Sequence, residues 1–251
     1  NTEKLTFEEV ADAWREEHWE QLQFGSLRTY APALRRAVEQ FGSRRLEDIT
    51  PKDVFLWLKN LGETYAYKTV ANHTSIVSQI YDYAIYNFRT DPYNPCDRVK
   101  IPQGLKKGTR EALSSDELQA VLSTTKDEFQ LGFIIAFTGC RLGEANALMM
   151  SDVDFQRGEI IISKSTYWKS NKPVIKAPKT ESGVRVVPLL PKLRERLLEL
   201  KLKPTDFLVS QGPEPLTLSA IERRWESWCR SHGLVVEERR DPTPSNKHTS
   251  V

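Results

Sequence analysis

Apolar side chains recur at helical spacing through residues 1–90, and the pattern stops at Asp91-Pro92-Tyr93-Asn94-Pro95. Proline fixes the backbone φ angle and removes an N–H donor, so this segment cannot continue a helix. Four periodic stretches precede it, each with one apolar face that must be buried. The spacing therefore predicts a small four-helix bundle that ends near residue 90.

Two of these helices begin with capping signals. Thr6-Phe7-Glu8-Glu9 is a capping box, and Thr50-Pro51-Lys52-Asp53 joins an N-cap to a proline at the first helical position. The side chains expected to face the bundle core are Phe7, Val10, Trp14, Tyr30, Leu34, Val38, Phe41, Val54, Leu58, Leu61, Ile76, Ile80 and Tyr83.

The residues after the proline-rich segment show mixed periodicity. A capping box at 114–117 opens one helix, and the apolar run 131–137 predicts a buried one. Short β-branched runs at 159–163 and 183–188 predict strands, with a possible middle strand between them. Further helices are expected at 142–150, 191–200 and 219–231.

The predicted fold class is mainly α with a small antiparallel β-sheet. We expect a four-helix domain over 1–90, a basic, proline-containing linker over 91–110 and an α+β domain over 111–251.

The net charge of +2 is distributed unevenly. The predicted linker has five basic residues and no acidic one between 98 and 110, and 164–203 holds eleven basic and three acidic residues. The linker bases are Arg98, Lys100, Lys106, Lys107 and Arg110. Such a polarised field suits a phosphate backbone, although solvated charge on a linker and a surface is the alternative interpretation.

Several classes of protein are disfavoured. Three cysteines without ligand spacing argue against a disulfide framework and a zinc site, so we expect a reducing, cytoplasmic location. No apolar run approaches the ~18 residues of a membrane span. Asp152 and Asp154 form a D-x-D pair, but strand geometry would point them to opposite faces, so we expect neither a metal nor a cofactor.

The most informative pattern is Thr138-Gly139-Cys140-Arg141-Leu142-Gly143-Glu144, followed by Ser151-Asp152-Val153-Asp154-Phe155 and then by Pro178-Lys179-Thr180-Glu181-Ser182-Gly183-Val184-Arg185-Val186-Val187-Pro188-Leu189. In this order and spacing, the pattern resembles the first half of the catalytic domain of the tyrosine recombinases, the phage-integrase family. The helical part of the chain also resembles the core-binding domain of that family.

The resemblance implies roles for three residues. Arg141 would neutralise charge on the scissile phosphate, because a guanidinium is always charged and offers a bidentate fork. Lys179 would donate a proton to the departing 5′-oxygen, and Glu144 would support the site without touching the phosphate. An exposed ion pair at Arg141 and solvated lysines in the hairpin are the alternatives. Lys169, Lys172 and Lys176 are candidate phosphate contacts beside Lys179.

The family's later residues have no counterpart here. An H-x-L-R box, a His or Trp and a nucleophilic Tyr would follow the last helices, yet all eight tyrosines precede Lys179. The chain is therefore interpreted as truncated within its catalytic domain, and its start without Met leaves room for an upstream arm-binding domain. We expect this chain alone to bind DNA without cleaving it. A degenerate, binding-only integrase remnant is one alternative, and a helical interaction protein unrelated to DNA is another.

The resemblance also implies partners. Double-stranded DNA would lie between the two domains, with the basic linker along its backbone and most contacts to phosphate. Self-association into a tetramer on paired sites is expected of the full-length parent, and no membrane is involved. The candidates for contacts to bases are Arg28, Arg35, Lys68 and Asn72.

Overall fold

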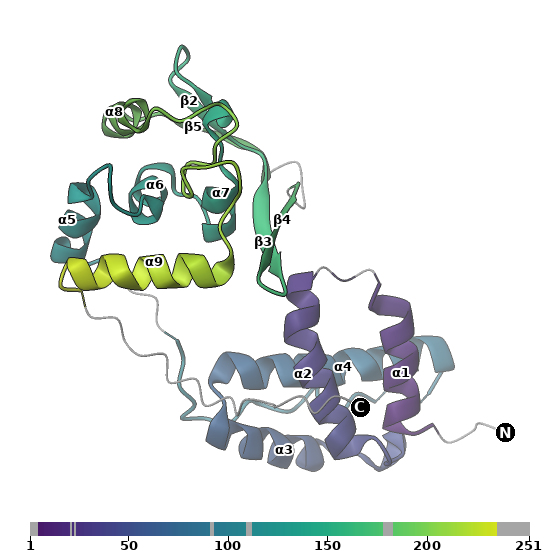
Figure 1. Cartoon of the computed structure of the whole chain (residues 1–251). Coiled ribbons are helices and arrows are strands. Elements are labelled where there is room, and N and C mark those ends of the chain that lie inside the picture. The colour runs from purple at the N-terminus through teal and green to yellow at the C-terminus, as the bar shows by residue number, and fades with distance from the viewer. Residues whose placement is uncertain are drawn as a thin grey trace, which may run out of the picture. The chain divides into compact units, whose positions relative to one another are not determined.

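The structure, a computed structural model, describes residues 5–20, 22, 24–90, 93–108, 112–177 and 183–234. The described residues fall into two compact units, one up to Gly108 and one from Ala112 to Leu234 (Figure 1). Each unit has its own hydrophobic core. The fold class expected from the sequence, mainly helical with a small antiparallel β component, is confirmed.

The first unit is the predicted four-helix bundle. Its helices are α1 (Phe7–His18), α2 (Phe24–Phe41), α3 (Pro51–Thr64) and α4 (Tyr67–Phe88), with a short 3-10 helix at Leu46–Asp48. The longest helix, α4, packs against each of the other three (Figure 1). Burial follows the predicted faces closely, since only Tyr30, Val38, Leu61 and Tyr83 of the expected core side chains remain partly exposed.

Both predicted capping signals form, and the N-cap at Thr50 proves to be a full capping box like that at Thr6. The Glu9 carboxylate accepts the Thr6 backbone N–H at 2.7 Å, and the Asp53 carboxylate accepts that of Thr50 at 2.8 Å. Asp53 also accepts a hydrogen bond from Arg44 at 3.1 Å. The Arg44 hydrogen bond is the largest of several contacts that hold the pKa of Asp53 well below its usual range. These short-range contacts fix where α1 and α3 begin.

Residues 93–108 of the predicted linker pack on the first unit. Cys96 is buried in the core of the bundle, and Val99, Ile101 and Leu105 pack against that core. Asn94 is 3% exposed and ties the start of this segment to α4. Its amide donates to the Ser78 carbonyl at 3.1 Å, while its carbonyl oxygen accepts the Cys96 N–H at 2.9 Å.

Asn94→Ala is expected to lower the free energy of unfolding of the first unit by about 2 kcal/mol, because it leaves buried backbone groups without partners. Urea denaturation followed by tryptophan fluorescence measures this loss. Asn87→Ala is the matched control, since Asn87 is exposed near the end of α4 and donates to the Tyr83 carbonyl of its own helix at 3.2 Å. Equal losses in the two variants would contradict the anchoring role of Asn94.

The described residues of the second unit form five α-helices, a short 3-10 helix (Met150–Asp152) and two small sheets. The helices are α5 (Ser115–Ser123), α6 (Leu131–Thr138), α7 (Leu142–Ala147), α8 (Pro191–Leu200) and α9 (Leu218–Ser231). The strands are β1 (Val153–Asp154), β2 (Glu159–Ile162), β3 (Ser165–Lys169), β4 (Lys172–Lys176) and β5 (Arg185–Pro188). In Figure 1, α6 lies between α5 and α7. Its side chains Phe133 and Ile134 are buried at the centre of the unit, as expected from its apolar sequence.

The strands form two sheets rather than the one expected. The three-stranded sheet has the order β1-β2-β5, and β3 pairs with β4 in a separate antiparallel hairpin. The possible middle strand between β2 and β5 is therefore two strands that pair with each other. Ser170 and Asn171 have φ angles of 48° and 66° at the turn, which lets the chain reverse within two residues.

Two further observations concern the described part of the chain. The cysteines are all unpaired and buried, at Cys96, Cys140 and Cys229. None of the helices in the described ranges combines the length and the apolar character needed to cross a bilayer.

Candidate functional site

Arg141 lies at the junction between α6 and α7. Helix α6 ends at Gly139, which has a φ angle of 62°, a left-handed conformation that costs glycine little. The chain then turns through buried Cys140, and Arg141 is the N-cap residue of α7. The Arg141 side chain is 83% exposed, so its guanidinium is available to a ligand from solvent.

Glu144 holds this junction together. It is only 8% exposed, and its carboxylate accepts hydrogen bonds from both ends of Arg141: the backbone N–H at 2.9 Å and Nη1 at 3.0 Å. Arg185, from β5, donates to the same carboxylate through Nη2 at 2.7 Å. One buried carboxylate therefore joins two guanidinium groups that are far apart in the sequence.

These contacts keep Glu144 ionised. The hydrogen bond from Arg185 is the largest cause that lowers its pKa, to about 2, and the contacts from Arg141 act in the same direction, whereas burial opposes them. The same pairing raises the pKa of Arg185 above its usual value. With two cations around one anion, the cluster keeps a surplus of positive charge, and Arg141 carries it to the surface.

Gly143 places α7 directly on the β3–β4 hairpin. A Cβ atom at this position would overlap the Thr166 carbonyl oxygen and lie 2.7 Å from Ser165 Oγ. Only glycine allows the backbones to approach this closely. The hairpin is therefore held beside the helix that begins at Arg141.

The hairpin carries the predicted lysines. Lys169 and Lys172 are paired across the turn and both are exposed, whereas Lys176 is half-buried with its ammonium 5.4 Å from the centre of the Tyr167 ring. The turn itself is tied to α9. Asn171 donates to Ser219 Oγ at 2.8 Å and accepts the Ser219 N–H at 3.0 Å.

The two carboxylates of the D-x-D pair have separate partners, and Asp152 lies in a short 3-10 helix (Met150–Asp152) rather than in the strand that was expected. Asp152 accepts the Met149 N–H at 2.7 Å and pairs with Lys164 at 3.0 Å. Asp154 instead accepts the backbone N–H groups of the following turn. Each carboxylate thus has its own structural partners, and Lys164 of the basic stretch is engaged rather than free.

Other predicted site residues lie elsewhere. Lys179 and Arg110 fall outside the described residues. On the first unit, four linker bases are exposed: Arg98, Lys100, Lys106 and Lys107. Lys107 lies 4.8 Å from the centre of the Tyr67 ring. Of the four candidates for base contacts, Arg28, Arg35 and Lys68 are exposed and Asn72 is half-buried, on α2 and α4.

The structure therefore brings together Arg141, Glu144 and Arg185. It holds the Ser165–Thr166 end of the hairpin beside α7, whereas the exposed lysines Lys169 and Lys172 lie at the turn end of the hairpin. Sequence reasoning assigned no role to Arg185, although it lies in the motif that contains Lys179. The available signal was a basic residue at the start of an otherwise apolar strand, but spacing alone does not reveal its partner.

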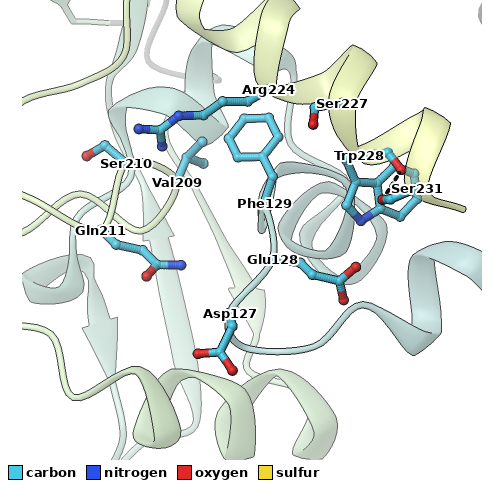
Figure 2. Close-up of a pocket in the computed structure, with 10 residues that line it drawn as sticks. All are labelled: Asp127, Glu128, Phe129, Val209, Ser210, Gln211, Arg224, Ser227, Trp228 and Ser231. Carbon is cyan, nitrogen blue, oxygen red and sulfur yellow. Dashed lines mark hydrogen bonds between the residues drawn. The ribbon is translucent and has the colours of Figure 1, made fainter.

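A pocket of about 370 Å³ lies apart from these residues on the second unit. Figure 2 shows that its walls come from the 127–129 loop, the 209–211 loop and α9. Arg224 lies beside the Phe129 ring, 6.0 Å from its centre (Figure 2). None of the predicted site residues lines this pocket.

Comparison with known proteins gives consistent matches. The family model of the phage integrase central domain matches residues 7–100. The ICEBs1 integrase of Bacillus subtilis is 32% identical over 158 residues, which cover 61% of this chain and 42% of that protein. A XerC-like tyrosine recombinase of Caldanaerobacter subterraneus is 28% identical over 162 residues, which cover 54% of this chain and 40% of that protein. The chain thus spans less than half the length of these relatives.

Solved structures share the fold. The Tn1549 transposon integrase in complex with transposon right end DNA superposes with a TM-score of 0.74 at 19% identity, over 92% of this chain and 81% of that one. A lambda integrase tetramer bound to a Holliday junction gives a TM-score of 0.66 at 17% identity, over 92% and 68% of the two chains.

Proposed function

Because this chain belongs to the tyrosine recombinase, or phage integrase, family, we propose that it is the DNA-binding part of a site-specific recombinase. The observation that carries the proposal is the exposed guanidinium of Arg141, held at the start of α7 by buried Glu144. The full-length protein would cut and rejoin DNA strands through a phosphotyrosine intermediate. Duplex DNA is the ligand, and the protein acts in the cytoplasm.

Arg141 contacts the scissile phosphate in this mechanism. Its Nη1 atom is oriented by Glu144, which leaves the remaining N–H groups directed away from that carboxylate. A fixed guanidinium stabilises the negative charge that develops on the phosphate oxygens as the strand breaks. Because the carboxylate is already paired with Arg185, it does not cancel the charge of Arg141.

Lys179 supplies the proton for the departing 5′-oxygen. It belongs to the segment between β4 and β5, and both strands are anchored in the second unit. Lys169, Lys172 and Lys176 contact the backbone nearby and position the duplex without selecting its sequence.

The two domains and the linker between them have different parts in binding DNA. Residues 1–90 form the core-binding domain, 91–110 the basic linker and 111–251 the part of the catalytic domain present here. The linker bases lie along the phosphate backbone, and exposed residues of α2 and α4 contact the bases. The full-length protein assembles as a tetramer on paired sites, and a lambda integrase tetramer bound to a Holliday junction shares the fold of this chain.

Binding to duplex DNA tests this function. The affinity is expected to fall on the order of 10³-fold between ~50 and ~200 mM salt, because each phosphate contact releases a counterion. Fluorescence anisotropy with a labelled duplex measures it. If the chain binds no duplex DNA, or binds it with an affinity that does not depend on salt, the proposal is wrong.

A matched pair of variants locates the contact. Lys169→Gln/Lys172→Gln should reduce the salt slope by about two contacts. Lys126→Gln/Arg230→Gln removes the same charge from exposed positions outside the two basic stretches and should leave the slope unchanged.

A binding-only relative of the integrases is the second candidate. The observation that favours it is that the exposed Arg141 and the exposed lysines of the β3–β4 hairpin can bind a phosphate backbone without any nucleophile. Such a protein would occupy DNA sites without cutting them. It predicts the same salt dependence and no cleavage in any longer form.

A further inference from the structure

The cluster around Glu144 contains one cation more than the proposed phosphate chemistry needs. Arg141 is 83% exposed and faces solvent, whereas the Arg185 side chain is only 32% exposed. Both donate to the same carboxylate, Arg141 through Nη1 at 3.0 Å and Arg185 through Nη2 at 2.7 Å. The shorter bond belongs to the more buried arginine.

Arg185 is fixed by the sheet on which it lies. Arg185 lies opposite Ile162 of β2 in the antiparallel pairing of β2 with β5. A strand position constrains the direction of the side chain, so Arg185 approaches Glu144 from a rigid support. Arg141, by contrast, follows the turn at Gly139 and is held mainly by its contacts with Glu144.

Arg185 also makes the largest single contribution to keeping Glu144 ionised. Its hydrogen bond is the largest of the contacts that lower the pKa of this carboxyl. Without Arg185, a buried carboxylate would have Arg141 as its only cationic partner among the described residues. Glu144 would then draw the Arg141 guanidinium inward and cancel its charge, which is the charge that a phosphate needs.

We propose that Arg185 is a positioning residue for Arg141, acting through Glu144. It neutralises the buried carboxylate, so that Glu144 orients Arg141 without cancelling its charge toward the DNA. This role rests on the proposed function, in which Arg141 contacts a phosphate. The competing role, in which Arg185 itself contacts the phosphate, differs in its dependence on Glu144.

A double-mutant cycle on the full chain separates these roles. DNA binding is measured by anisotropy at low salt for Arg185→Gln, Glu144→Gln and Glu144→Gln/Arg185→Gln. Arg185→Gln should weaken binding about tenfold, and the double variant should return to within about threefold of the unmodified chain, because no carboxylate remains to cancel Arg141. Arg185→Lys keeps a cation and should recover most of the binding. Arg194→Gln, which removes an exposed arginine of α8, is the control for charge alone.

An NMR titration of the glutamate side-chain carboxyl carbons gives a second readout that does not depend on DNA. The pKa of Glu144 should rise by about one unit or more in Arg185→Gln and stay low in Arg185→Lys. An equal loss of binding with and without the Glu144 carboxylate would overturn the proposal in favour of direct phosphate contact. An unchanged Glu144 pKa in Arg185→Gln would also overturn it. If the unmodified chain binds no DNA, the proposed function itself fails, and this inference fails with it.

Discussion

Arg141→Ala is expected to slow DNA strand cleavage on the order of 10³-fold or more, in a protein that joins this chain to the H-x-L-R box and the tyrosine of the family. The substitution removes a guanidinium that is 83% exposed and fixed by Glu144 at 3.0 Å. Negative charge grows on the phosphate oxygens only as the bond breaks, so the loss falls mainly on the transition state. Single-turnover cleavage of a suicide DNA substrate measures it.

Binding should change far less than cleavage. Arg141 is one of many basic groups in contact with the duplex, so its loss should weaken equilibrium binding by no more than about tenfold. Arg157→Ala is the matched control, since this arginine of the same unit is 78% exposed and pairs only loosely with Asp154, at 3.8 Å. Normal cleavage by Arg141→Ala would refute the assigned role. If the protein without any substitution binds DNA but does not cleave it, the binding-only relative is the favoured function.

The helices of this chain could be predicted because their signals are local. A capping box spans four residues, and an apolar stripe repeats every three or four, so both can be read from short windows. The boxes at Thr6 and Ser114 form as expected, and Ile76 and Ile80 of α4 are fully buried. Most of the four-helix bundle follows from such windows.

The β3–β4 hairpin was only partly predicted, for a physical reason. Its strands mix polar, basic and apolar residues and are mostly half-buried, so they lack the clear alternation of apolar and polar residues that marks a strand with one buried face. The signal lay in the turn, where Asn171 tolerates a left-handed conformation better than most residues. Because the chain reverses at this turn, β3 and β4 pair with each other and form the second sheet.

The packing of residues 93–108, which follow α4, could not be predicted from the sequence for a different reason. Prolines predict that α4 must end, but they do not predict whether the following backbone packs or extends. Val99, Ile101 and Leu105 bury their side chains without a regular period, because the segment follows the contour of the bundle. Irregular packing of this kind has no periodic signature in a sequence.

The same difference between local and distant contacts applies to the candidate site. The motif around Arg141 and Glu144 predicts a pair three residues apart, which the structure brings together on α7. The pairing of Glu144 with Arg185 depends on how β5 lies against α7, and no spacing rule contains that information. The assigned roles of these residues, and that of Lys179, remain predictions for the experiments above.

The pairing has a measurable consequence for stability. The hydrogen bond from Arg185 is the largest cause that lowers the pKa of Glu144 in the folded chain, from an ordinary value of 4.5 to about 2. A carboxyl whose pKa is depressed by folding stabilises the fold above its unfolded pKa, and this contribution is lost as the pH falls toward the folded pKa. The shift corresponds to about 3 kcal/mol at neutral pH.

Glu144→Gln should remove this contribution and leave Arg185 without its anionic partner. At pH ~7 the free energy of unfolding is expected to fall by about 3 kcal/mol, and roughly 2 kcal/mol of that difference should already be gone at pH ~3. Urea denaturation from pH ~7 down to pH ~3 measures the difference. Glu195→Gln, an exposed glutamate of α8, controls for the loss of one carboxylate. A difference between Glu144→Gln and the unmodified chain that stays constant over this range would show that the two arginines do not hold Glu144 ionised. The charge balance proposed for Arg141 would then be wrong as well.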